Sequence, residues 1–240
     1  MNVMPGGELK QAERERKTAP WEKGRQWDRL APFYNLGCKL LFLPFGGEKR
    51  VRRRFLDFAN VMRGASLLDL GCATGVLTRL VAARTGSSGR AIGVDRSRAM
   101  LARAARGAAA GGSSGRPEFV EADLAELPFA DSSFDRVLAF MILHELPSET
   151  RRAALQEAAR VLRPGGRLVV ADYNPDARGI AGLLMRGLVK LTEPPSAGEI
   201  LHGLHLTVID SLFRLERTAE LLYGLVQVAV AKKPEPAYRL

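Results

Sequence analysis

Apolar residues recur with two different periods along this chain, and these periods predict where its strands and helices lie. Short, nearly continuous apolar runs predict buried strands at 66–70, 91–95, 117–121, 134–140 and 167–172. Apolar residues at helical spacing predict the helices between them, at 74–84, 97–107 and 149–162. Strands that alternate with helices indicate a parallel sheet covered by helices on both faces.

The pattern changes after residue 173. We expect a helix with an apolar face at 177–191, a loop at 192–198 and a further helix at 199–213. Two strand patterns then follow each other at 214–220 and 225–232, with only a short turn between them. Consecutive strands joined in this way predict an antiparallel hairpin at the edge of the sheet.

The chain ahead of residue 61 divides into two unlike parts. Residues 1–20 combine Pro, Gly and mixed charges without an apolar period, which predicts a disordered tail. Residues 21–60 carry apolar residues at helical spacing, broken by Pro44 and Gly46, and predict two or three short helices. We expect these helices to form a lid on a domain at 61–240, with a mere covering of the core as the alternative.

A glycine-bracketed turn lies between the first predicted strand and its helix, in the stretch LLDLGCATGVLT at 67–78. Gly71 can adopt backbone angles that other residues avoid, and Gly75 lets the chain pass close to a ligand. The first turn of the helix leaves free N–H groups that suit a carboxylate or a phosphate. Asp95, at the end of the second strand, is placed to accept hydrogen bonds from both hydroxyls of a ribose.

Two classes of nucleoside cofactor fit a turn of this kind. A dinucleotide site would show the spacing G-x-G-x-x-G, whereas Ala73 and Val76 stand where its second and third glycines would be. The missing glycines argue against a nicotinamide oxidoreductase. An ordinary strand-to-helix turn without a ligand remains an alternative for this stretch taken alone.

Four stretches resemble class I S-adenosylmethionine-dependent methyltransferases, in the same order along the chain. They are LLDLGCATG at 67–75, GVDRS at 93–97, EADLAELPFADSSFDRVLAF at 121–140 and EAARVLRPGGRLVVADY at 157–173. The last two, with WDRLAPFYN and FGGEKRVRR near the N-terminus, are similar to the ubiquinone/menaquinone C-methyltransferase group. The resemblance implies a Rossmann-like, seven-stranded and mostly parallel sheet with an antiparallel edge hairpin.

The resemblance also implies S-adenosyl-L-methionine as cofactor and assigns residues to its methionine part. The residues of the glycine turn would line that part, namely Asp69, Gly71, Cys72, Ala73, Thr74 and Gly75. Phe140 and Met141, at the end of the fourth strand, would flank the transferring methyl group. Ala73 departs from the glycine that is usual in the family. Asp69 could instead serve only to anchor the turn.

The nucleoside part of the cofactor is assigned to the ends of the second and third strands. Asp95 would hold the ribose, with Arg96 stacked near the adenine. Asp123 would accept a hydrogen bond from the adenine amino group, and the Leu124 N–H would face a ring nitrogen. The alternative for Asp123 is that it caps a following turn.

Methyl transfer from a sulfonium is an in-line displacement, for which an enzyme supplies alignment and a dry site. A base is needed only if the acceptor loses a proton. His144, just past the fourth strand, is the candidate catalytic base because a neutral imidazole is available near pH 7. It could instead only shape the acceptor pocket, which we expect Tyr34, Tyr173 and Asn174 to line together with it.

The acceptor is expected to be a small apolar or aromatic molecule, such as a quinone precursor. Asp172 and Tyr173 stand where the quinone enzymes usually carry Glu-Phe, which leaves the acceptor open. Phosphatidylethanolamine, methylated on nitrogen, is an alternative acceptor. A non-catalytic, regulatory domain that binds S-adenosylmethionine is an alternative to an enzyme.

Charge limits the partners of this chain of 240 residues. Its 36 Lys and Arg exceed its 26 Asp and Glu, for a formal net charge of +10. The arginines are spread along the chain and no N-P-P-Y-type motif follows the fourth strand, so we expect a small-molecule acceptor and no nucleic acid. The basic, apolar stretch 40–54 could rest on an anionic membrane surface, with a helix whose arginines lie in water as the alternative.

The remaining expectations concern location, metals and assembly. No apolar run is long enough to span a membrane and no secretory signal is visible, so we expect a cytoplasmic protein, with contact at the inner membrane face as an option. His202 and His205 could pair around a metal, but no third ligand is evident and we expect no metal site. The oligomeric state is open, with a homodimer as one option.

Overall fold

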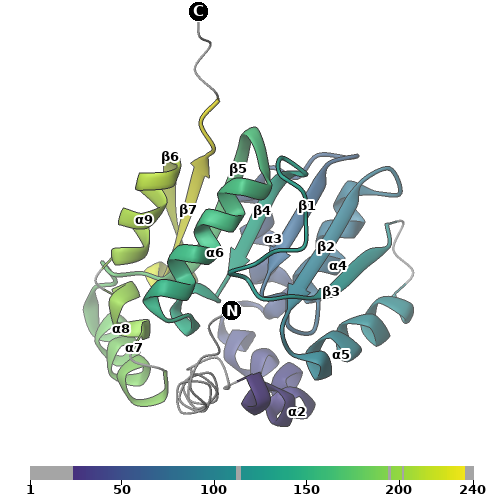
Figure 1. Cartoon of the computed structure of the whole chain (residues 1–240). Helices are drawn as coiled ribbons and strands as arrows, with labels where there is room; N and C mark the ends of the chain where they lie inside the picture. Colours follow the sequence, from purple (N-terminus) through teal and green to yellow (C-terminus); the bar gives the residue numbers. More distant parts are fainter. Residues whose placement is uncertain (1–23, 112–114, 194–195, 202, 236–240) are drawn as a thin grey trace, which may run out of the picture.

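A computed structural model describes residues 24–235 of the chain, apart from 112–114, 194–195 and 202 (Figure 1). The tail predicted at residues 1–20 lies outside this range. The division into a lid at 21–60 and a domain at 61–240 stays a prediction. Helices and strands nevertheless follow each other largely as the apolar pattern indicates.

Seven strands form one sheet in the order β3-β2-β1-β4-β5-β7-β6. The strands β1 to β5 pair in parallel, whereas β7 runs antiparallel to both β5 and β6. The predicted Rossmann-like fold with its edge hairpin is confirmed. The strand bounds are Ser66–Leu70 (β1), Arg90–Asp95 (β2), Pro117–Glu121 (β3), Phe134–Phe140 (β4), Leu162–Tyr173 (β5), Arg214–Leu221 (β6) and Val226–Lys232 (β7).

Helices cover both faces of the sheet, with α6 and α9 in front of it and α3 behind it in Figure 1. The α-helices are Gly24–Phe42 (α2), Glu48–Ala59 (α3), Val76–Thr85 (α4), Arg98–Ala109 (α5), Ser148–Val161 (α6), Gly179–Thr192 (α7), Ser196–Leu201 (α8) and Leu204–Leu212 (α9). Short 3-10 turns lie at Leu43–Phe45 (η2), Leu143–Glu145 (η3) and Leu222–Gly224 (η4).

The alternation of side chains along the strands divides the core into two apolar clusters, one on each face of the sheet. In β1, Leu68 and Leu70 belong to the cluster under α6 and α9. Leu67 points to the other face and joins the cluster that includes Phe55 of α3 and Leu77 of α4. Asp69 lies two residues after Leu67, so its side chain is near the carboxyl end of β1 on the face that α4 covers.

The N-terminal region forms two α-helices joined by a 3-10 turn, in agreement with the two or three helices predicted, but the first of them is long. The helix α2 has 19 residues and continues through Pro32 and most of the apolar run at 40–43. It ends where η2 begins, and the backbone then turns at Gly46 and Gly47, whose φ angles are +86° and +90°. The predicted break in the apolar run therefore lies at the glycines, and α3 follows as a separate helix.

Close packing of β2 against the β1–α4 turn makes Gly93 a sensitive position. A Cβ atom there would lie 2.7 Å from Cys72 Cβ and 2.7 Å from Thr78 Oγ1. We expect Gly93→Ala to lower the free energy of unfolding by about 1–3 kcal/mol in urea denaturation, because the added methyl overpacks this site. Gly37→Ala in α2 is the matched control, since a Cβ there meets nothing within 4 Å. Equal effects of the two substitutions would contradict this packing.

Candidate functional site

The turn between β1 and α4 closely follows the backbone course that its glycines predict. Gly71 and Gly75 have φ angles of +65° and +69°, in the left-handed region that favours glycine. Space forbids a side chain as well, because a Cβ atom on Gly71 would lie 2.5 Å from Ile142 and one on Gly75 would lie 2.5 Å from Phe119. Ala73 also has a positive φ of +48°, which is a costly angle for a residue with a Cβ.

Asp95 holds this turn against the end of β2. Its Oδ2 accepts a hydrogen bond of 2.8 Å from the Ala73 N–H, and its Oδ1 accepts one of 2.9 Å from the Ser97 N–H. Burial raises the pKa of Asp95, although these backbone bonds oppose the change. Each carboxylate oxygen can accept a second hydrogen bond, so the chemistry of Asp95 fits the ribose hydroxyls that were predicted for it.

Asp69 lies beneath the turn and is bonded within the protein. Its Oδ2 accepts a hydrogen bond of 2.6 Å from the Thr78 hydroxyl. Burial raises the pKa of Asp69 to about 6, against the effects of Thr78 and of the positive charge of Arg52. These contacts are those of a residue that anchors the turn. The Cys72 thiol beside it is also buried, and burial raises its pKa.

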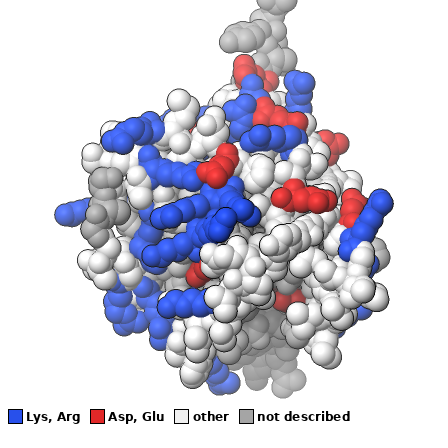
Figure 2. Space-filling view, turned by 180° about the vertical axis from the view of Figure 1, so that it is seen from behind, with Lys and Arg blue, Asp and Glu red and all other residues white. Residues whose placement is uncertain are grey.

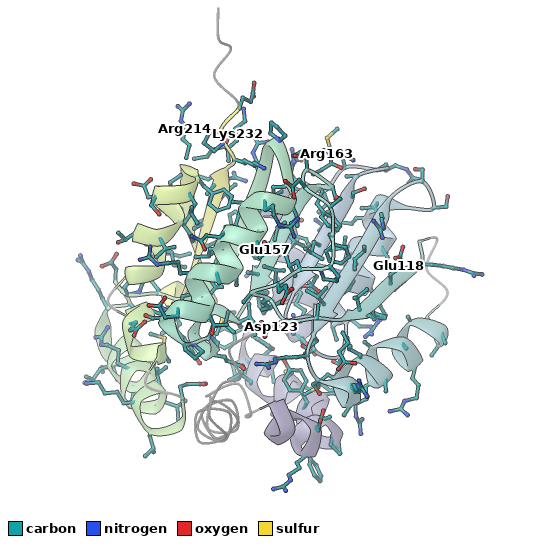
Figure 3. The ribbon with its side chains drawn as sticks, viewed as in Figure 1. Glu118, Asp123, Glu157, Arg163, Arg214 and Lys232 are labelled. Atoms are coloured by element: carbon teal, nitrogen blue, oxygen red, sulfur yellow. The ribbon has the colours of Figure 1, made fainter. Side chains whose placement is uncertain are left out.

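Asp123 and Arg96 lie at the exposed ends of β3 and β2. Asp123 Oδ1 accepts a hydrogen bond of 2.9 Å from the Ala125 N–H, which is the turn-capping contact considered for it. Its Oδ2 is 3.9 Å from Arg96 Nη2. Figure 3 shows Asp123 at the lower end of the sheet, on the side where α2 lies. Leu124 beside it is buried in the core, and the adenine contacts of these residues stay predictions.

The helix α2 forms hydrogen bonds with the segments that follow β1 and β2. Asn35 Oδ1 accepts a hydrogen bond of 2.7 Å from the Thr74 hydroxyl. Asp28 Oδ1 accepts one of 2.5 Å from the Ser97 hydroxyl, whose oxygen also caps α5. Asn35 and Asp28 were not found from the sequence. Their contacts are those that a lid over the turn would make.

A buried arginine supports the floor beside the turn. Arg52 forms an ion pair of 2.9 Å with Glu48, and its guanidinium lies 4.8 Å from the centre of the Phe140 ring. The neighbouring Arg53 and Arg54 are exposed, so the expectation of arginines in water holds for them and is wrong for Arg52. The signal for its burial is its place within the apolar face of α3.

The predicted acceptor residue Tyr34 and the predicted methyl-flanking residues lie close to this arginine. Burial raises the pKa of Tyr34, and Cys38 raises it further while Arg52 opposes the change. The Phe140 ring packs at 5.1 Å from the Phe55 ring. Met141 has a φ of +54°. The contacts of these residues with an acceptor or a methyl group stay predictions.

A second cluster of polar side chains surrounds His144, where β4 and β5 end. Its Nδ1 lies 2.8 Å from Asp172 Oδ1, and both side chains are buried. Its Nε2 lies 4.0 Å from Glu145 Oε1 and 3.9 Å from Glu193 Oε2. The Tyr173 ring packs against the imidazole at 4.7 Å, and its hydroxyl donates a bond of 3.1 Å to Glu193.

These carboxylates change the expected charge of His144. Burial favours the neutral ring, but Asp172, Glu145 and Glu193 outweigh it and raise the pKa of His144 to about 9. The expectation of a neutral imidazole near pH 7 is therefore wrong for this structure. Burial raises the pKa of Glu145 to about 7. Glu145 and Glu193 were missed in the sequence, and only the pair His-Glu after β4 pointed toward the first.

The polar side chains around His144 adjoin the glycine turn between β1 and α4. Ile142, two residues ahead of His144, fills the space beside Gly71 that a Cβ would need. The charges of Asp95 and Asp172 both contribute to the raised pKa of Glu145. A nucleoside held at the turn and an acceptor held at His144 would thus be neighbours.

Asn174 is hydrogen-bonded within the protein. Its Nδ2 donates a hydrogen bond of 2.7 Å to the Gly224 carbonyl, and its Oδ1 accepts one of 3.0 Å from the Asp176 N–H. The amide therefore holds the turn between β5 and α7 against the edge hairpin. Its predicted role in lining the acceptor pocket stays a prediction.

Neither a metal cluster nor a membrane-spanning helix is found in the described part of the chain. No group of three or more His, Cys, Asp or Glu side chains there could hold a metal ion. His202 and the side chain of His205 lie outside the described residues. Of the helices described, none combines the length and the apolar character that crossing a bilayer requires.

Comparison with known proteins gives consistent results. A profile of the methyltransferase domain family matches residues 67–166. The demethylmenaquinone methyltransferase of Thermus thermophilus is 40% identical over 161 residues, which cover 67% of this chain and 70% of that protein. The ubiquinone/menaquinone biosynthesis C-methyltransferase UbiE of Hahella chejuensis is 36% identical over 149 residues, which cover 62% of this chain but only 58% of that protein.

Solved structures share the fold at low sequence identity. The cyclase SpnF superposes with a TM-score of 0.68 at 20% identity, covering 90% of this chain and 97% of that one. The N-methyltransferase NodS from Bradyrhizobium japonicum, solved with S-adenosyl-L-homocysteine, superposes with a TM-score of 0.59 at 16% identity, covering 78% of this chain and 88% of that one. Since a cyclase and a methyltransferase appear together, the shared fold does not determine the reaction.

The buried pair of His144 and Asp172 predicts a distinctive titration. A histidine whose pKa is raised stabilises the fold fully below its unfolded value of 6.5, and this contribution is lost as the pH rises through about 9. We expect Asp172→Asn to move the pKa of His144 below 6.5, because burial then dominates. NMR titration of the imidazole signals measures the pKa, with His144→Gln to assign the peak. Titration of the wild-type ring near 6.5 would contradict the pairing.

Proposed function

Because the chain belongs to the S-adenosylmethionine-dependent methyltransferases, we propose that it methylates a small aromatic acceptor that carries an acidic hydroxyl. Quinols and phenols of the quinone-precursor type have this chemistry. The observation that carries the proposal is the buried pair of His144 and Asp172 beside the glycine turn. The related quinone methyltransferases of other organisms support the choice of an aromatic acceptor.

The residues at the strand ends fit the cofactor by their chemistry. Asp95 retains acceptor capacity for two ribose hydroxyls, and Asp123 has one carboxylate oxygen beyond its turn-capping bond. The glycine turn brings backbone close to the ligand without a side chain in the way. When bound, S-adenosylmethionine would supply a methyl group attached to a sulfonium sulfur. This sulfur would be the leaving group of an in-line displacement.

His144 would act as the base that accepts the proton of the acceptor hydroxyl. In its neutral form its Nε2 can take the proton of an aromatic hydroxyl, while Asp172 accepts the hydrogen bond from Nδ1 and stabilises the resulting imidazolium. Loss of this proton would leave the acceptor as an electron-rich oxyanion, whose oxygen or ring carbon would be the nucleophile for the methyl group that the cofactor supplies. Glu145 and Glu193, each about 4 Å from Nε2, further favour the proton-bearing ring. Proton release from His144 to water completes the cycle.

The same carboxylates favour a second candidate acceptor. A primary ammonium group, as in phosphatidylethanolamine, would be attracted by the carboxylates of Asp172, Glu145 and Glu193, which surround His144. The nitrogen would have to lose a proton before it could attack the methyl group. A hydroxyl acceptor and an ammonium acceptor are distinguished by comparing turnover of a hydroquinone, a phenol and phosphatidylethanolamine under the same conditions.

Cofactor binding gives the first test of the proposal. We expect S-adenosylhomocysteine to bind the wild-type protein in isothermal calorimetry, and Asp95→Ala to weaken binding by about tenfold to a hundredfold through lost charge-assisted hydrogen bonds. Asp123→Ala should weaken it less. Asp131→Ala, at an exposed carboxylate paired with Arg160, is the matched control and should change nothing. Wild-type protein that ignores the ligand would exclude the proposed function.

Turnover gives the second test. We expect His144→Gln to lower kcat on a hydroxyl acceptor by about a hundredfold to ten-thousandfold, with cofactor affinity kept. Since the neutral ring is the base, kcat/KM of the wild type should rise with pH and level near pH 9. Asp172→Asn should move this rise to lower pH and reduce the plateau. A flat profile with unchanged turnover in His144→Gln would remove the proposed role of the histidine.

A further inference from the structure

The helix α2 is apolar on its outward side as well as its inward side. Ala31 and Phe42 are buried on the inward side. On the outward side Phe33, Leu36 and Leu40 are exposed by 67%, 57% and 63%. Their spacing places these three side chains on one face of the helix. A run of exposed apolar side chains on one helix face is suited to an apolar partner.

The helix α7 repeats this arrangement. Met185 and Val189 pack inward against Ala177 and Ala197. The opposite face consists of large apolar side chains that are exposed by 66% to 84%, namely Ile180, Leu183, Leu184 and Leu191. Single exposed leucines are common on protein surfaces, but a whole helix face of them marks an interaction site.

The outward faces of α2 and α7 lie at one end of the molecule. Contacts of Tyr223 and Gly224 connect the two segments. Figure 1 shows α2 and α7 beyond the carboxyl ends of the parallel strands, where the polar groups of the site lie. Tyr223, exposed by 88%, packs at 5.7 Å on Phe45, which follows α2 in η2. The next residue, Gly224, accepts the hydrogen bond of Asn174 at the start of the α7 segment. We call α2, η2, Tyr223 and α7 the apolar end.

Basic residues border the apolar end, whereas two acids near it are hydrogen-bonded within the protein. Lys39, Lys49 and Arg50 lie exposed beside α2 and η2, and Lys190 lies exposed on α7, a helix without an acidic residue. By contrast, Asp28 bonds to Ser97, and Glu48 bonds to Arg52 in the interior. Figure 2 shows that Lys and Arg also gather on the rear face, where α3 lies.

Arginines from other elements add to α3 on that rear face. Arg84, Arg136 and Arg217 donate hydrogen bonds of 3.1 to 3.2 Å to backbone carbonyls of α3. The apolar end is therefore continuous with a basic face. A second copy of the chain would bring like charges together, since each copy carries a net charge of +10. An anionic lipid surface has both the apolar and the charged complement.

We propose that the apolar end docks on an anionic bilayer surface, with the outward faces of α2 and α7 inserted at the level of the headgroups. Tyr223 suits such a boundary because its ring is apolar and its hydroxyl is polar. Docking would turn the carboxyl ends of the strands toward the lipid. If the proposed function holds, an apolar acceptor could then reach His144 without crossing water.

Vesicle co-sedimentation of the full chain tests the docking without cofactor or acceptor. We expect the protein to pellet with vesicles of equal parts phosphatidylcholine and phosphatidylglycerol at low salt, and much less with phosphatidylcholine alone. The double variants Leu36→Glu/Leu40→Glu and Leu183→Glu/Leu184→Glu should each reduce binding by about tenfold or more, because each removes two inserted side chains. Lys39→Glu/Lys190→Glu should reduce the preference for anionic vesicles.

The control variant is Met62→Glu, which adds one carboxylate, where each double leucine variant adds two, at a side chain exposed by 63% between α3 and β1, away from the apolar end. It should pellet like the wild type. Unchanged circular dichroism and an unchanged thermal unfolding midpoint show that each variant is folded, and because no cofactor is used this test is separate from that of the proposed function. Absence of pelleting with anionic vesicles overturns the proposal. So does a wild-type dimer in analytical ultracentrifugation that the α7 variant dissociates.

Discussion

The Asp95 carboxylate is the contact on which the arrangement of the glycine turn depends. By accepting the Ala73 and Ser97 N–H groups it joins the turn after β1 to the turn after β2. A positive φ at Ala73 is costly, and this bond from its N–H offsets part of that cost. The same carboxylate keeps capacity for further donors. One acid therefore shapes the turn and remains able to recognise a ligand.

Close backbone packing brings the segment after β4, which carries His144, next to this turn. Ile142 occupies the volume that a side chain on Gly71 would need, so the segment after β4 approaches β1 closely only because glycine stands there. His144 follows two residues later and is oriented by Asp172 from the end of β5. The order of the strands in the sheet, with β4 between β1 and β5, is what makes this meeting possible.

Buried charge is compensated throughout this end of the protein. Arg52 pairs with Glu48, lies over the Phe140 ring and lowers the pKa of Asp69 against the effect of burial. The carboxylates around His144 stabilise its protonated ring and raise its pKa against the effect of burial. An unpaired charge in either place would carry a large desolvation cost. Removal of one partner should therefore disturb the protonation of the others as well as their positions.

The sequence by itself determined the five parallel strands, the edge hairpin, the glycine turn and the acid at the end of β2. These features depend on neighbouring residues, because the apolar period and the turn chemistry act over short stretches of chain. Only the tertiary structure decided that Arg52 is buried while Arg53 is exposed, and that His144 meets Asp172 from 28 residues away. It also decided that the outward sides of α2 and α7 stay uncovered. The burial of a side chain and the charges near it depend on elements that are remote in sequence, and these set both its pKa and its available partners.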